Sequence, residues 1–117
     1  APYQVTTDAG AIDIALTNLV TNAANFSPEH GVITVGLCKN AEYFALTIDD
    51  QGPGIDEAQR DRLFERFYSR GNAKGAGLGL TIVQTIAQRL GGRVRLENRE
   101  TGGLRATLEI PVRAHVT

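Results

Sequence analysis

The stretch KGAGLGLTIVQTIAQRL, residues 74–90, joins a glycine-rich loop to an amphipathic helical pattern. Gly75, Gly77 and Gly79 alternate with small residues, and Gly79 stands where the helix is expected to start. Glycine inside a helix costs about 1 kcal/mol relative to alanine, so this placement needs a reason. A loop of this kind exposes backbone N–H groups at the positive end of the helix dipole, which favours phosphate. Simple turn chemistry also places glycines at helix starts, so this stretch alone leaves both interpretations open.

The helix that follows is expected to bury a stripe of residues spaced by four, namely Leu78, Ile82, Ile86 and Leu90. Gly91 and Gly92 then end the helix. A hairpin completes the chain, with a first strand at 93–98, a turn at 99–103 and a second strand from residue 104 to 112. The second strand alternates, which places its apolar residues on one face: Leu104, Ala106, Leu108 and Ile110.

Upstream of the quoted stretch, Asp8 is a suitable N-cap for a helix that runs to Phe26. Its apolar residues recur at spacings of three and four and predict one buried face: Ile12, Leu16, Leu19, Ala23 and Phe26. Strands are expected at 3–7, 32–38 and 43–50, and a short helix at 56–67. The predicted fold class is α+β, a two-layer α/β sandwich in which about three helices cover one face of a mixed sheet. Residues 1–117 form one domain in this interpretation.

Composition sets limits on function. The chain has 117 residues, 42% of them hydrophobic and 21% charged, with a net charge of −1, which gives no reason to expect nucleic acid or anionic lipid as the main partner. No apolar run reaches membrane-spanning length. The lone Cys38 is interpreted as a small buried residue of a strand. Because the chain begins with Ala1 and lacks methionine, we expect it to be a fragment of a longer protein.

Three asparagines form a second stripe on the first helix. Asn18, Asn22 and Asn25 are spaced by four and three, and a solvated face would usually carry Lys and Glu instead. Their amide oxygens suit a hard cation such as Mg²⁺, and their amide N–H groups suit phosphate. A polar flank that happens to use amides is the alternative.

A carboxylate ends an otherwise apolar strand face. Phe44, Leu46, Ile48 and Asp50 share one face by alternation, and a buried carboxylate needs a partner. Asp50 either caps the following turn or accepts hydrogen bonds from a ligand that approaches over Gly52 and Gly54. Asp49 points to the other face and is interpreted as solvated.

Five motifs occur in order: NLVTNAANFSP at 18–28, DDQGPGI at 49–55, LFERFYSRG at 63–71, GAGLGLTIV at 75–83 and TGGLRATLEIP at 101–111. Together they resemble the N, G1, F and G2 boxes and the terminal strand of the ATP-binding catalytic domain of sensor histidine kinases. That domain belongs to the GHKL superfamily and has the Bergerat fold. The resemblance covers residues 8–111, and it implies ATP and Mg²⁺ as ligands. The glycine loop matches neither a Walker loop nor a dinucleotide fingerprint.

The resemblance implies a role for each matching residue. Asn22 is the expected Mg²⁺ ligand, Asn18 supports the metal and the phosphates, and Asp50 accepts a hydrogen bond from the adenine amino group. Arg70 is the expected basic residue near the terminal phosphates, so Asn18, Asn22 and Arg70 make up the catalytic set. Phe26 packs on adenine or simply belongs to the core.

The remaining expected contacts follow the same boxes. The nucleotide-lining glycines are Gly52, Gly54, Gly75, Gly77 and Gly79. Further expected contacts are Asn25, Ile55, Lys74, Leu78, Leu80 and Thr107, of which Lys74 is as readily a solvated side chain. Phe64 and Phe67 match the F box, which in relatives anchors the lid over the nucleotide, although both also suit a core.

Two departures bear on mechanism. Relatives often carry Lys or Arg where this chain has Asn25, so phosphate neutralisation is expected to rely on Mg²⁺ and Arg70. Hydrolytic members of the superfamily place a glutamate at the position of Asn18, and an amide cannot act as a general base. The resemblance therefore implies transfer of the γ-phosphoryl group to a protein histidine.

His30 and His115 do not lie in the sequence setting of an acceptor histidine. The acceptor is expected on separate dimerisation helices of the parent kinase, with a response regulator downstream. The isolated chain is expected to be a cytoplasmic monomer that contacts no membrane, within a membrane-anchored parent. The alternatives are a hydrolytic GHKL ATPase, a serine kinase of the anti-sigma type, and a regulatory nucleotide-binding domain without activity.

Overall fold

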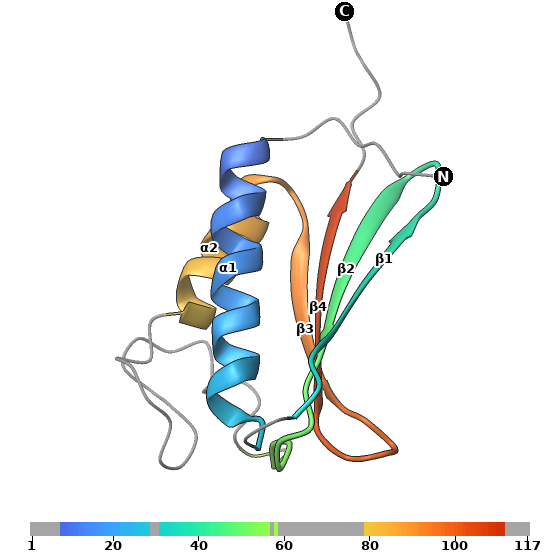
Figure 1. Ribbon diagram of the computed structural model, residues 1–117. Coiled ribbons are helices and arrows are strands. Elements are labelled where there is room, and N and C mark those ends of the chain that lie inside the picture. The colour runs from blue at the N-terminus through green and yellow to red at the C-terminus, as the bar shows by residue number, and fades with distance from the viewer. Residues whose placement is uncertain (1–7, 29–30, 57, 59–78, 112–117) are drawn as a thin grey trace, which may run out of the picture.

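In the part of the chain that the structure describes, two helices pack against one face of a four-stranded sheet (Figure 1). The computed structural model describes residues 8–28, 31–56, 58 and 79–111. Its elements are α1 (Ala9–Phe26), β1 (Thr34–Lys39), β2 (Tyr43–Asp49), α2 (Gly79–Arg89), β3 (Arg93–Asn98) and β4 (Leu104–Pro111). The strand order is β1-β2-β4-β3. The predicted α+β class and two-layer arrangement are confirmed.

Helix α1 begins as predicted, at the N-cap Asp8, whose Oδ1 accepts a hydrogen bond of 3.0 Å from the backbone N–H of Ala11. Leu19 and Ala23 are buried as expected, and Ile12 and Leu16 pack against the core while partly buried. Ala15 is also fully buried. Such a small residue adds little to a pattern of large apolar side chains, which is why the periodicity did not single it out.

Helix α2 confirms part of the predicted stripe, because Ile86 is buried and Leu90 packs partly buried against the core. Its buried residues are Leu80, Val83, Ile86 and Ala87, whereas Ile82 is 40% exposed, so the prediction for Ile82 was wrong. Steps of four residues advance the helix by about 400°, so a strict four-residue stripe rotates away from a flat partner. The predicted end is confirmed, because the N–H groups of Gly91 and Gly92 bond the carbonyls of Gln88 and Ala87 at 3.1 and 2.8 Å.

The core lies between the helices and the inner face of the sheet. On β2 and β4 the buried residues pair across the strands as Phe44 with Ile110, Leu46 with Leu108 and Ile48 with Ala106. These are the alternating positions that the sequence predicted. Cys38, in contrast, is exposed, which corrects its assignment as a buried residue. It lies on the edge strand β1 opposite Ala45, on the outer face that the helices do not cover.

Each pairing of the described strands is antiparallel, whereas a mixed sheet was expected. Hairpins join β1 to β2 and β3 to β4, and short connections impose antiparallel pairing. Strands β2 and β3 run parallel to each other, but β4 lies between them. The strand expected at 3–7 and the helix expected at 56–67 lie outside the described residues, apart from isolated positions of the latter.

Candidate functional site

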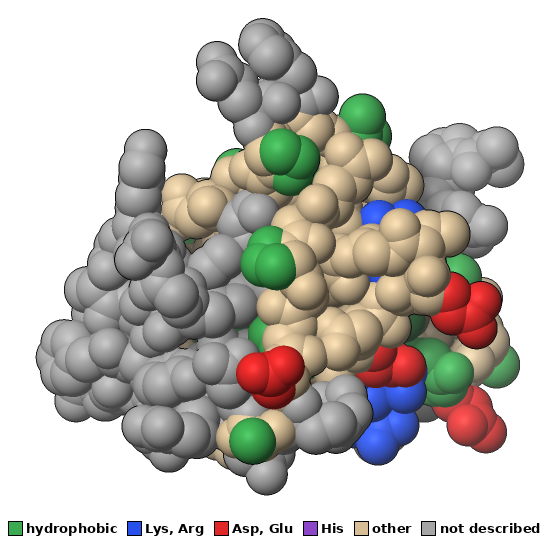
Figure 2. Space-filling view, turned by 90° about the horizontal axis from the view of Figure 1, so that it is seen from below, with side chains coloured by type: hydrophobic (Ala, Val, Ile, Leu, Met, Phe, Trp, Pro, Cys, Tyr) green, Lys and Arg blue, Asp and Glu red, His purple; other side chains and the backbone are tan. Residues whose placement is uncertain are grey.

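One end of the sandwich gathers most of the predicted site residues that the structure describes. The C-terminal half of α1, the start of α2, the loop after β2 and the β3–β4 turn all face this end (Figure 1). Figure 2 views the molecule from this side. Its described surface is mostly backbone and uncharged polar groups, with hydrophobic side chains in isolated patches and a few charged side chains among them. Such a surface can offer hydrogen bonds to a polar ligand.

Asp50 follows directly after β2, and it is only 2% exposed. Its Oδ1 accepts hydrogen bonds from the backbone N–H groups of Gly52 at 2.9 Å and Leu104 at 3.0 Å. The bond from Gly52 confirms that Asp50 caps the turn after the strand. The bond from Leu104 ties the carboxylate to β4, so the carboxylate is held in one orientation at the end of the apolar face.

The loop after Asp50 is tied to the end of α1. The backbone N–H of Gln51 donates to Ser27 Oγ at 3.2 Å, and Gln51 Oε1 accepts from the backbone N–H of Val32 at 3.0 Å. Ser27 is the C-cap residue of α1. These bonds hold the loop beside the helix that carries the asparagine stripe.

Gly54 and Ile55 form the far end of this loop. Gly54 has φ of +78°, a conformation that L-residues rarely adopt, and a Cβ there would lie 2.5 Å from Asn98 Oδ1. Asn98 Oδ1 accepts from the Ile55 N–H at 2.8 Å, and Asn98 Nδ2 donates to the Ile55 carbonyl at 2.6 Å. The glycine at position 54 is thus required by its own backbone conformation and by a protein side chain that approaches it.

Sequence reasoning did not identify Asn98. An asparagine between a strand and a turn is ordinary turn chemistry. Only the tertiary structure brings this residue beside Ile55, which is 43 positions away.

Asp49 corrects a second expectation, because it is 7% exposed and paired, not solvated. On the outer face of the sheet it accepts two hydrogen bonds from Arg105, from Nε at 2.7 Å and from Nη2 at 2.8 Å. Arg99 Nε lies 3.8 Å from Asp49 Oδ2. The hydrogen bonds from Arg105, together with the charges of Arg105 and Arg99, hold the pKa of Asp49 below its ordinary value of 3.8, although burial acts in the opposite direction.

The asparagine stripe meets the start of α2 at Asn18. Asn18 Nδ2 donates to the Ile14 carbonyl at 2.8 Å, which leaves Oδ1 directed toward Gly79. A Cβ on Gly79 would lie 3.5 Å from Asn18 Oδ1, an ordinary contact distance. Helix packing against the described residues therefore does not require glycine at position 79. Asn22 is half-buried and Asn25 is exposed on the same helix.

Two predicted contacts are placed elsewhere. Thr107 pairs with Thr47 and Arg95 on the outer face of the sheet, because it alternates with the core residues Ala106 and Leu108. The structure therefore does not bring Thr107 to the face that carries Asp50. The side chain of Leu80 is buried in the hydrophobic core.

Several predicted residues lie outside the described part of the chain: Phe64, Phe67, Arg70, Lys74, Gly75, Gly77 and Leu78, together with His30, His115 and the side chain of Phe26.

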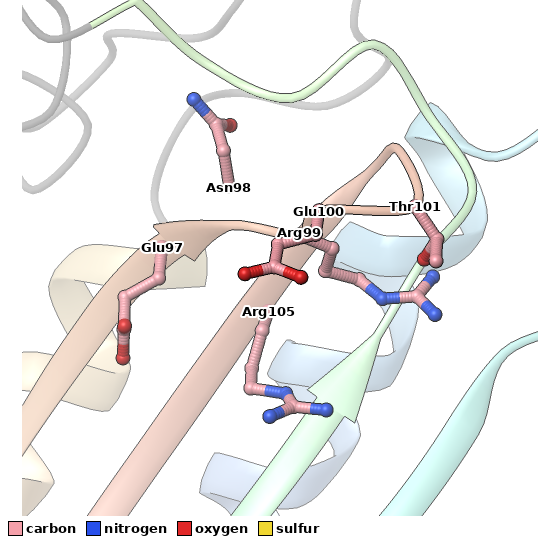
Figure 3. A pocket seen from close by; sticks show the side chains of 6 residues that line it. All are labelled: Glu97, Asn98, Arg99, Glu100, Thr101 and Arg105. Carbon is pink, nitrogen blue, oxygen red and sulfur yellow. The ribbon is translucent and has the colours of Figure 1, made fainter.

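A polar pocket of about 480 Å³ lies at the β3–β4 turn (Figure 3). Its lining residues are Glu97, Asn98, Arg99, Glu100, Thr101 and Arg105. None of them belongs to the predicted nucleotide contacts, and Arg99 and Arg105 are engaged with Asp49.

Within the described ranges, no group of three or more His, Cys, Asp or Glu side chains is arranged to hold a metal ion. Neither described helix combines the length and the apolar character needed to cross a bilayer.

Comparison with known proteins places this geometry in a family. Residues 7–114 match the family model described as histidine kinase-, DNA gyrase B- and HSP90-like ATPase. The chain is 41% identical over 106 residues to the signal transduction histidine-protein kinase/phosphatase MprB of Mycolicibacterium vanbaalenii, covering 87% of this chain and 22% of that protein. It is 35% identical over 116 residues to the sensor histidine kinase CpxA of Escherichia coli K12, covering 95% of this chain and 25% of CpxA.

Solved structures agree with these relatives. The mycobacterial sensor histidine kinase MprB superposes with a TM-score of 0.84 at 34% identity, over 96% of this chain and 77% of that chain. The catalytic domain of the histidine kinase ThkA superposes with a TM-score of 0.82 at 33% identity, over 92% and 71%. The full-length kinase ShkA in complex with AMPPNP superposes with a TM-score of 0.80 at 28% identity, over 96% and 24%.

The chain spans about a quarter or less of the length of the curated relatives named here. The ordered motifs, the two-layer fold and the relatives agree with one another. The chain belongs to the histidine kinase-, DNA gyrase B- and HSP90-like ATPase family, and it is an ATP-binding catalytic domain of the sensor histidine kinase type.

Proposed function

We propose that this chain binds Mg-ATP and delivers the γ-phosphoryl group to a histidine on a separate dimerisation and phosphoacceptor domain. The acceptor helices of the same parent kinase are its immediate partner, and a response regulator is the next acceptor in the relay. We place this activity in the cytoplasm, with the parent anchored in the inner membrane and this domain making no contact with the bilayer or with nucleic acid.

The buried carboxylate of Asp50 is the observation that carries the proposal. A carboxylate at the end of an apolar face is costly unless it is hydrogen-bonded, and the backbone N–H groups of Gly52 and Leu104 donate to Oδ1 and orient it. A carboxylate accepts hydrogen bonds but cannot donate them. It therefore selects the amino group of adenine, whereas guanine would present a carbonyl oxygen in that position.

The residues of α1 suit a magnesium-bound triphosphate. Mg²⁺ usually keeps several waters and takes one or two protein oxygens together with substrate phosphates. The amide oxygens of Asn18 and Asn22 are of that kind. Asn22 would hold the ion and Asn18 Oδ1 would support it from beside the start of α2. The ion, when bound, neutralises charge that develops on the transferring phosphoryl group.

Phosphoryl transfer needs positioning and charge neutralisation more than covalent chemistry. Asn18 cannot activate water as a general base, so we assign transfer to a protein acceptor and only slow hydrolysis. Arg70, Lys74 and the glycines 75, 77 and 79 complete the proposed phosphate site.

Calorimetric titration with ATP tests the base site. We expect ATP to bind in the presence of Mg²⁺ and GTP to bind at least tenfold more weakly, because one lost or opposed hydrogen bond to a charged acceptor is worth about 1.5–3 kcal/mol. Asp50→Ala is expected to abolish ATP binding. The same titration without Mg²⁺ measures the contribution of the metal. Equal affinity for ATP and GTP, or undiminished binding in the Asp50→Ala variant, would contradict the proposal.

Radiolabelled ATP then separates kinase from hydrolase. The chain is expected to release phosphate slowly alone and to transfer label to acceptor helices supplied in trans. Rapid release of phosphate without an acceptor would assign the chain to the hydrolytic members of the family.

A further inference from the structure

The loop from Asp50 to Ile55 is held at both ends by two consecutive residues, Asn98 at the end of β3 and Arg99 directly after it. Arg99 Nη1 donates to the Asp50 carbonyl at 2.8 Å, and Asn98 bonds both the N–H and the C=O of Ile55. In Figure 3 the side chains of Asn98 and Glu97 project from β3 in opposite directions. One short segment thus connects the start and the end of the loop that follows the adenine-selecting carboxylate.

The packing around this connection leaves little freedom. Gly54 has no side chain where Asn98 Oδ1 approaches, and a Cβ on Gly103 would collide with the Asp50 carbonyl. Leu104 donates to Asp50 Oδ1 and accepts from the Asp50 N–H at 2.9 Å. The loop therefore cannot shift relative to β4 without breaking several of these bonds at once.

We propose that Asn98 is a positioning residue for the nucleotide base, acting through the backbone of Gly54 and Ile55. This inference rests on the proposed function, since it assumes that the base binds beside Asp50. The carboxamide of Asn98 holds the backbone of Gly54 and Ile55 at a set distance from the carboxylate of Asp50 before the ligand binds. Preorganisation of this kind raises affinity because the loop does not have to be ordered on binding.

The two polar atoms of the Asn98 carboxamide, Oδ1 and Nδ2, can be tested separately. Oδ1 accepts a hydrogen bond from the Ile55 N–H, and Nδ2 donates one to the Ile55 carbonyl. Asn98→Ala removes both hydrogen bonds. Asn98→Asp keeps the acceptor, removes the donor and places a carboxylate oxygen against a carbonyl oxygen, with almost no change in size.

The experiment measures the dissociation constants of ATP and ADP for the wild-type chain, both Asn98 variants and a control. We expect each Asn98 variant to raise the dissociation constants of ATP and ADP about tenfold and by the same factor. The factors should be equal because Asn98 supports the loop beside the base and not the phosphate site. Hydrogen exchange of the Ile55 amide is expected to accelerate in Asn98→Ala. These results would support a positioning role.

Asn40→Ala is the matched control. The side chain of Asn40 also makes two hydrogen bonds to backbone groups in a turn, but at the opposite end of β2: its Oδ1 accepts from the N–H groups of Glu42 at 2.8 Å and Tyr43 at 2.9 Å. Its loss is expected to lower the melting temperature and to change nucleotide affinity less than twofold. A similar loss of affinity in the control would show that general destabilisation explains the Asn98 result, and would overturn the proposal.

The outcomes separate this inference from the function on which it rests. Wild-type protein that does not bind ATP contradicts the proposed function. Wild-type protein that binds ATP, with Asn98 variants within twofold of it, overturns the role of Asn98 alone. If Asn98→Ala does not fold, the nearly isosteric Asn98→Asp decides by the same twofold criterion.

Discussion

Asp49 is the last residue of β2 and Asp50 follows it directly, and the alternation of the extended chain directs their identical side chains to opposite faces of the sheet. Asp49 meets two arginines on the outer face, so its charge is compensated within the protein. The carboxylate of Asp50 accepts backbone N–H groups at the end of the inner face. The carboxylate of Asp49 thus pairs with cations, whereas the carboxylate of Asp50 is the one that we propose to accept a hydrogen bond from the ligand.

Gly54 allows a prediction at the residue scale. Gly54→Ala is expected to lower the free energy of unfolding by about 2–3 kcal/mol, because alanine is strained at positive φ and its Cβ would press against Asn98 Oδ1. Urea denaturation measures this change.

Gly102→Ala is the control for the backbone contribution. Gly102 has φ of +99° and no atom within 4 Å of a Cβ built on it, so only the conformational cost of about 1 kcal/mol is expected. Equal losses in the two variants would show that the contact with Asn98 adds no strain.

At the scale of elements, the β3–β4 hairpin orders the loop that follows β2. Strand β4 pairs with β2 along the length of β2, and the end of β3 and the turn after it bring Asn98 and Arg99 to the loop. The ion pair between Asp49 and Arg105 links the same two strands on the outer face. The hairpin is therefore a support for the site as well as part of the sheet.

This ion pair predicts a pH dependence. The pKa of Asp49 is lower in the folded chain than its ordinary 3.8, so the pair stabilises the fold fully above about pH 4. The stabilisation is lost as the pH falls below 3.8 through the depressed pKa. Asp49→Asn is expected to be about 1 kcal/mol less stable at pH 7, a modest value because Arg105 is half exposed, and the difference should shrink toward pH 2.

Thermal unfolding of the wild type and Asp49→Asn across pH 2–7 measures this difference. Arg105→Gln should cause a similar loss at pH 7, and the double variant should lose less than the sum. A difference that stays constant down to pH 2 would contradict the role of the Asp49 charge.

At the scale of the whole molecule, the two faces of the sheet differ in chemistry. The inner face is covered by α1 and α2, and the described outer face carries charged side chains that pair across strands. Glu109 Oε1 lies 3.0 Å from Arg93 Nε and 2.8 Å from Arg95 Nε. The charged, paired part of this face, at β3 and β4, offers little apolar area for self-association.

We therefore expect the isolated chain to be a monomer. Light scattering should return the mass of one chain at every concentration measured. A stable dimer in solution would contradict this expectation and would indicate an apolar contact surface elsewhere on the molecule.

Local sequence patterns determined most of the fold. Asp8 as an N-cap, the buried face of α1, the alternation along β2 and β4, and the glycines that end α2 depend on neighbours in sequence, and each was predicted. The two-layer arrangement followed from these amphipathic elements. The same alternation already places Thr107 on the face opposite Ala106, so its assignment to the site could have been rejected from the sequence.

Contacts between distant residues depended on the tertiary structure. Asp49 and Arg105, which bond each other, are 56 positions apart in the sequence, and Asn98 and Ile55 are 43 positions apart. No local periodicity predicts either contact. The strand order places β4 beside β2. The residues of β4 therefore determine which polar groups of β2 are paired and which are solvated. The sequence was therefore sufficient to identify Asp50 and the asparagine stripe as candidates for a site. The residues that hold Asp50 and its loop in place became visible only when the sheet was assembled, because burial and pairing are properties of surfaces that distant segments form together.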